Sequence, residues 1–101
     1  MTSVDLVRAL ALALEAVERS PPEALILDFG EMAGQLNAAP EEIRITFEQL
    51  DDLDLIEGPG LHREAWMFRR LSPLGRLFVD EIRHLKRWRA IKARYNLADS
   101  E

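Results

Sequence analysis

The N-terminal part of the chain carries a helical pattern of apolar positions. From Val4 to Arg19, apolar residues recur at steps of three and four, with charged residues between them. This spacing places the apolar side chains on one face of an α-helix. Pro21 and Pro22 end the pattern, because proline lacks a backbone N–H and restricts the preceding residue. The sequence therefore predicts an amphipathic helix over residues 4–19.

A short apolar run and a capping pattern follow. Residues 25–29 are apolar and partly alternating, which predicts a single short strand. Asp28 precedes Glu31 by three residues, a spacing typical of a capping box at the start of a helix. We therefore expect a second helix over residues 30–36. Its inward-facing residues are Met32, Ala33 and Leu36.

A third helix has the most clearly marked start in the chain. Pro40 suits the first helical position, and Glu41 and Glu42 favour the positive end of the helix dipole. Apolar residues then recur at helical spacing, which predicts a helix over residues 40–53. Its buried face consists of Ile43, Phe47, Leu50 and Leu53.

The pattern beyond the third helix predicts a β-hairpin. Residues 55–57 form its first strand, residues 58–60 (Gly-Pro-Gly) its turn, and residues 65–71 the returning strand. Alternation along the returning strand turns two alternate residues of 66–68 to the core and the third outward. An aromatic side chain exposed there would be a candidate contact with a partner.

The last predicted helix is long. Ser72 and Pro73 are typical of a helix start, and nothing interrupts the helical pattern before Asn96. The stripe of apolar residues on this helix is therefore longer than a small domain needs to cover its core. Its apolar residues are Leu74, Phe78, Ile82, Leu85, Trp88, Ile91 and Tyr95.

Composition limits the class of protein. A chain of 101 residues without cysteine has room for one domain and excludes disulfides, thiolate metal sites and cysteine nucleophiles. The absence of cysteine favours a reducing compartment, so we expect a cytoplasmic protein. The apolar stretch 9–14 is too short to span a bilayer, so we expect no entry into the membrane. The histidines are single and distant, and no nucleophile or phosphate-loop motif is present. We therefore expect no enzyme activity, no cofactor and no metal.

The charge of the chain is divided along its length. Residues 1–60 hold three basic and thirteen acidic residues, a net −10, whereas residues 61–95 hold ten basic and three acidic residues, a net +7. Such a division of charge suits either the binding of a polyanion by the basic part or the pairing of this chain with another copy of itself. The basic run 86–94 has a plainer interpretation as a solvated helix face.

The order helix, strand, helix, turn, helix, strand, wing, strand, helix resembles the winged helix-turn-helix superfamily. The segment 71–76 (Leu-Ser-Pro-Leu-Gly-Arg) is similar to the signature with which many such domains leave the wing. The resemblance implies an α+β, mostly helical domain over residues 1–101, with a three-stranded small sheet and a long C-terminal helix in which residues 86–101 are a helical extension. Among its subfamilies, small phage-associated winged-helix proteins are the most similar. Asp54 stands where the superfamily usually has glycine, so the end of the third helix is expected to turn differently.

The resemblance implies a dimeric transcriptional regulator that binds double-stranded DNA. Helix 40–53 would lie in the major groove and the wing would reach phosphates. The candidate nucleic-acid contacts are Arg44, Thr46, Gln49, His62, Arg63, Arg69, Arg70, Lys86 and Arg87. The exposed face of the helix is mainly acidic, however, and phosphates repel carboxylates.

That acidic face supports an alternative, a protein-binding adaptor or a phage-encoded inhibitor. Glu41, Glu48 and Asp52 would then contact basic residues of a protein partner. Trp88, Ile91 and Tyr95 would either cover helix 4–19 or form the seam of a homodimer.

The third helix ends in a separate acidic cluster, formed by Asp51, Asp52 and Asp54. Acidic residues at a helix C-terminus oppose the dipole, so something is expected to compensate them. Arg69 or Arg70 would do so within the chain, and a basic protein surface or a metal are the alternatives.

Overall fold

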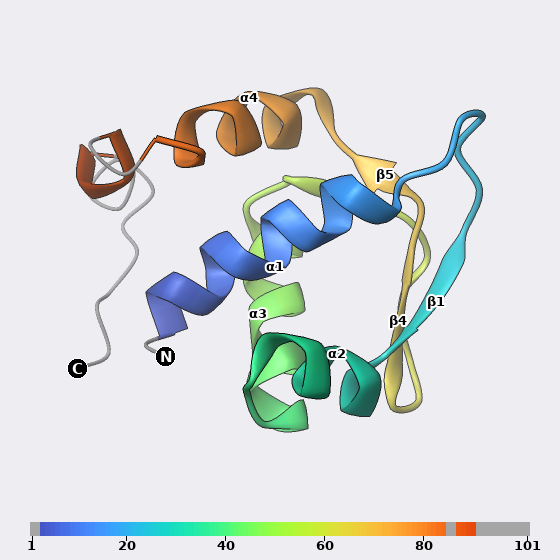
Figure 1. Cartoon of the computed structure of the whole chain (residues 1–101). Coiled ribbons are helices and arrows are strands. Elements are labelled where there is room, and N and C mark those ends of the chain that lie inside the picture. Colours follow the sequence, from blue (N-terminus) through green and yellow to red (C-terminus); the bar gives the residue numbers. More distant parts are fainter. Residues whose placement is uncertain (1–2, 85–86, 91–101) are drawn as a thin grey trace.

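The computed structural model, which describes residues 3–84 and 87–90, is an α+β arrangement of helices around a small antiparallel sheet (Figure 1). α1 lies between α3 and α4, in agreement with the contacts between these elements. In chain order the elements are α1 (Ser3–Val17), β1 (Leu25–Asp28), α2 (Phe29–Leu36), α3 (Pro40–Asp52), β2 (Ile56–Glu57), β3 (Gly60–His62), β4 (Ala65–Phe68), β5 (Arg70–Leu71) and α4 (Pro73–Ile82).

β4 is the central strand of the three-stranded sheet, whose order is β1-β4-β3. Trp66 of β4 lies opposite Leu27 of β1 and Leu61 of β3. β2 and β5 form a separate two-stranded ladder, in which Ile56 lies opposite Leu71. The prediction of a small three-stranded sheet is therefore confirmed, but its third strand is β3, whereas the predicted strand 55–57 lies in the separate ladder as β2.

The predicted turn of the hairpin is wrong, because the chain reverses at Arg63 and Glu64 and not at residues 58–60. His62 pairs with Ala65 across a two-residue turn. The predicted returning strand 65–71 is also divided, since Arg69 lies between β4 and β5. The longer hairpin lets β4 pair with both of its neighbours, which buries the aromatic residues of that strand.

A kink in the hairpin takes the place of the predicted turn. The amide of Arg69 donates to the carbonyl of Glu57 at 2.8 Å, and Pro59 has no N–H to continue the ladder. Gly58 has a φ of 149°, and a Cβ there would lie 2.6 Å from the carbonyl oxygen of Met67. Only glycine therefore allows the two backbones to approach so closely.

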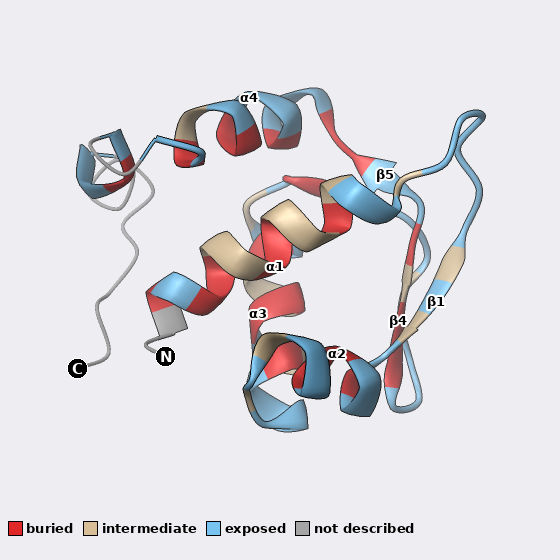
Figure 2. Cartoon of the chain, in the orientation of Figure 1, coloured by how far each residue is buried: buried red, intermediate tan, exposed pale blue. Residues whose placement is uncertain are grey.

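The core is formed by the buried faces of the four helices, which turn toward one another (Figure 2), together with Trp66 and Phe68 of β4 and Leu71 of β5. Trp66 and Phe68 both turn into it, so the aromatic contact considered for this strand is wrong; the residue between them, Met67, is half-buried. Phe47 of α3 stacks on Trp66 with 5.3 Å between ring centroids and lies 6.0 Å from Phe29. These rings join α2, α3 and the sheet.

The end of α3 turns as a glycine would allow, although the residue is Asp54. Asp54 has a φ of 58°, in the left-handed region. Its amide donates to the carbonyl of Asp51, and the amide of Leu55 donates to that of Leu50, both at 3.0 Å. This pair of bonds defines a Schellman motif, which glycine usually completes. The expectation that Asp54 makes this helix end turn differently from a glycine is therefore wrong, because the aspartate adopts the conformation that glycine usually takes.

The Asp54→Gly variant should raise the free energy of unfolding by about 0.5–1 kcal/mol. Glycine adopts the left-handed conformation without the steric cost that a Cβ carries there. The substitution also removes one carboxylate from the negative end of the helix dipole. Urea denaturation measures the change, and an unchanged or lower midpoint would contradict the strain assigned to this residue.

α4 starts on a close contact with the end of α3. The hydroxyl of Ser72 donates to the carbonyl of Asp54 at 2.6 Å and accepts the amide of Gly75 at 2.9 Å. A Cβ on Gly75 would lie only 1.9 Å from the carbonyl oxygen of Leu55. The signature noted in the sequence therefore has a structural role, since it joins the hairpin and α4 to the α3 terminus.

The prediction of one long C-terminal helix is wrong, because α4 ends at Ile82. Arg83 and His84 form a turn, and residues 87–90 are helical again. A straight helix would separate residues 78 and 88 by about 15 Å along its axis. The turn instead brings the Trp88 ring to 6.2 Å from the Phe78 ring, where the indole is buried. Leu74, assigned to the buried stripe, is exposed.

Candidate functional site

α3 is held at the surface by a short turn that follows α2. Asn37 caps α2 in the left-handed conformation, with a φ of 55° and a ψ of 51°. The carboxylate of Glu42 accepts the amide of Ala39 at 2.9 Å, which fixes the start of α3. Ile43 and Phe47 are fully buried on the inner face of the helix. The opposite face of α3 therefore points to solvent.

The solvent face of α3 is acidic. It includes one exposed apolar side chain, Ile45, at 43% exposure. We define the α3 face as the exposed or half-buried residues Glu41, Glu42, Arg44, Ile45, Glu48, Asp51 and Asp52. With five carboxylates and one cation, this face presents a net negative charge.

Arg44, the cation of the α3 face, is engaged by its own helix. Its guanidinium donates to Glu48 at 2.6 Å and to both carboxylate oxygens of Glu41. The hydrogen bond with Glu41 raises the pKa of Arg44 above its ordinary value, and Arg44 in turn lowers the pKa of Glu41. Both shifts in pKa favour the charged forms of Arg44 and Glu41. The spacings of three and four residues could have predicted this clamp from the sequence.

The other two predicted DNA contacts on α3, Thr46 and Gln49, are not fully exposed to solvent. Thr46 is 2% exposed and donates its hydroxyl to the Glu42 carbonyl at 2.7 Å, so its side chain is turned into the protein. Gln49 is half-buried, and its Oε1 is buried without a hydrogen-bond partner among the described residues. The buried face of α3 is wider than the spacing of its apolar residues predicted. It therefore includes Thr46 and part of Gln49.

The tip of the hairpin carries two of the predicted contacts, His62 and Arg63, and both are exposed. Arg63 has a φ of 56°, a conformation that costs an arginine about 1–2 kcal/mol relative to glycine. The tip is short, because Asp28 at the end of β1 lies opposite Ala65. Only the residues of the two-residue turn extend beyond the three-stranded sheet.

Much of the basic charge in the last third of the chain is paired within the molecule. Arg76 contacts Glu18 at 3.0 Å, and Arg83 forms an ion pair with Glu15. Arg70 contacts Glu57 at 2.8 Å. Within residues 61–84 and 87–90, the arginines without an acidic partner are Arg63, Arg69, Arg87 and Arg89.

The acidic cluster at the end of α3 is not compensated as predicted. Arg70 pairs with Glu57 instead. Within the described ranges, no ion pair joins an arginine to Asp51, Asp52 or Asp54. The same ranges contain no group of three residues placed to hold a metal. The three aspartates are exposed at this end of α3.

The C-terminal candidates are only partly described. Trp88 is buried against Phe78 of α4, so it is not free to form a seam with a second copy. Arg87 is exposed. Lys86, Ile91 and Tyr95 lie outside the described residues, as does most of the predicted extension 86–101.

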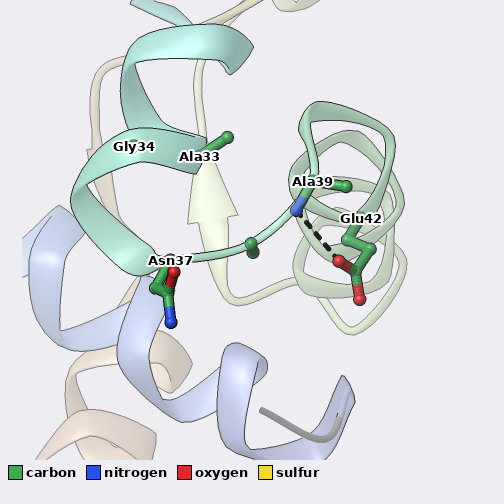
Figure 3. Close-up of a pocket in the computed structure, with 6 residues that line it drawn as sticks. Ala33, Gly34, Asn37, Ala39 and Glu42 are labelled. Atoms are coloured by element: carbon green, nitrogen blue, oxygen red, sulfur yellow. Dashed lines mark hydrogen bonds between the residues drawn. The ribbon is translucent and has the colours of Figure 1, made fainter.

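A hollow of about 430 Å³ lies beside the turn between α2 and α3 (Figure 3). Ala33, Gly34, Ala38 and Ala39 line most of it, and Asn37 and Glu42 lie at its opposite ends. The Glu42 carboxylate already accepts the amide of Ala39. The hollow therefore lies along the junction between α2 and α3, and one of its two polar side chains is already engaged.

In the part of the chain that the structure describes, none of the helices has the length and apolar character required to cross a bilayer. Comparisons with protein-family models, with curated proteins and with solved structures found no match to the chain.

Proposed function

We propose that the chain is a winged helix-turn-helix domain. α2, the turn at Asn37 and α3 would form the helix-turn-helix, and the β3–β4 hairpin would be the wing. The order of the elements supports this assignment, since a strand precedes α2 and a hairpin joins α3 to α4. The pairing of β1 with β4 supports it further, because it ties the wing to the start of α2.

We infer that this domain acts by binding another protein through the α3 face. The observation that carries the proposal is that Arg44, the cation of the α3 face, forms ion pairs with Glu41 and Glu48 of its own helix. A helix placed in the major groove brings its exposed side chains close to phosphates, where uncompensated carboxylates are repelled. The α3 face is better suited to a basic protein surface.

The partner would carry lysine or arginine residues opposite the acidic residues of the α3 face. Asp51 and Asp52 are the most available carboxylates, because they are exposed and form no ion pair within the described ranges. Complementary charges of this kind steer association and select among partners. An adaptor, or an inhibitor that occupies a basic site on another protein, would work in this way.

The triple variant Glu41→Lys, Glu48→Lys and Asp52→Lys should lower affinity for the partner at least about tenfold, since it places cations against a basic surface. The matched control is Glu23→Lys, Glu31→Lys and Glu64→Lys, which makes the same change in net charge at exposed positions elsewhere. Partners captured from a lysate by the parent chain would be compared by titration with each variant. Full retention by the α3 variant, or equal loss by the control, would contradict the proposal.

A DNA-binding regulator is the second candidate, and the arginines without acidic partners favour it. Arg63 lies at the hairpin tip, and an arginine kept in the left-handed region is a reason to consider a contact there. In this candidate the wing and the C-terminal part would carry the phosphate contacts. The same domain would form the homodimer expected of the superfamily.

The Arg63→Ala variant tests this candidate. If Arg63 contacts a phosphate, its loss should weaken duplex binding and reduce the dependence of log K on log salt by about 1. Arg44→Ala is the matched control, because Arg44 already pairs with two carboxylates and should change little. Titrations of duplex across a salt series, with the mass of the free protein measured alongside, give both results. No binding at low salt would eliminate the candidate.

A further inference from the structure

We draw no further inference here: the strongest candidate, the open edge of the sheet along β1, where Ile26 is the most exposed large hydrophobic side chain of the described residues, carries nothing because nothing in the structure shows what covers it.

Discussion

The Gly75→Ala variant should lower the free energy of unfolding by about 3 kcal/mol, at the upper end of what overpacking costs. The added Cβ would lie 1.9 Å from the carbonyl oxygen and 2.9 Å from the carbonyl carbon of Leu55. Both are backbone atoms, and the same carbonyl accepts the amide of Ser72 at 3.0 Å. Ser72 caps the start of α4, so neither Leu55 nor this helix start can move away without disturbing that bond.

Thermal unfolding followed by circular dichroism measures this effect, and the midpoint should fall by roughly 12–24 °C. Gly34→Ala is the matched control, because Gly34 lies within α2 and a Cβ there meets nothing within 4 Å. Alanine at that position should stabilise the protein by about 0.5–1 kcal/mol through its higher helix propensity. If both variants melt at or above the parent temperature, the close contact at Gly75 is wrong.

The Phe47→Ala variant should cost about 3–5 kcal/mol, as truncation of a buried phenylalanine usually does. Its ring is fully buried and nearly parallel to that of Trp66, with an angle of 9° between the planes. Removing it leaves a cavity where α2, α3 and β4 meet. Because α2 and β4 hold α3 in place, the variant should also lose binding of a partner to the α3 face.

Urea denaturation measures the cost, and near-ultraviolet circular dichroism reports the loss of the Phe47–Trp66 stack. Ile45→Ala on the same helix is the control, since Ile45 is 43% exposed and its loss should change stability by less than about 0.5 kcal/mol. Phe47→Leu keeps the site apolar and should fall between the two. A cost below about 1 kcal/mol for Phe47→Ala would show that the core is not centred on this ring.

The helices near the start of the chain could be predicted from sequence because their determinants are local. Asp28 accepts the amide of Glu31 at 3.0 Å, and α2 begins within one residue of its predicted start. Pro40 is the first residue of α3, as expected. Capping groups and apolar spacing act over one or two turns, so a single segment contains all the information that its start requires.

The hairpin and the last helix depended on contacts between distant segments. Pro59 and its flanking glycines favour a turn locally, but pairing of β4 with β1 moves the reversal to Arg63 and Glu64. The spacing of apolar residues also could not predict that α4 ends at Ile82. The burial of Trp88 against Phe78 is a tertiary gain that a local pattern does not contain.

The sequence by itself determined the α+β class, the order of the helices and the acidic character of the third helix. Only the tertiary structure decided which charges are available: Glu18 lies 3.0 Å from Arg76, which is 58 residues away in sequence, and so the basic part of the chain is partly neutralised. It also decided that Thr46 is buried. The physical reason is that capping and periodicity are properties of neighbours in sequence, whereas burial and ion pairing depend on which segments meet in space.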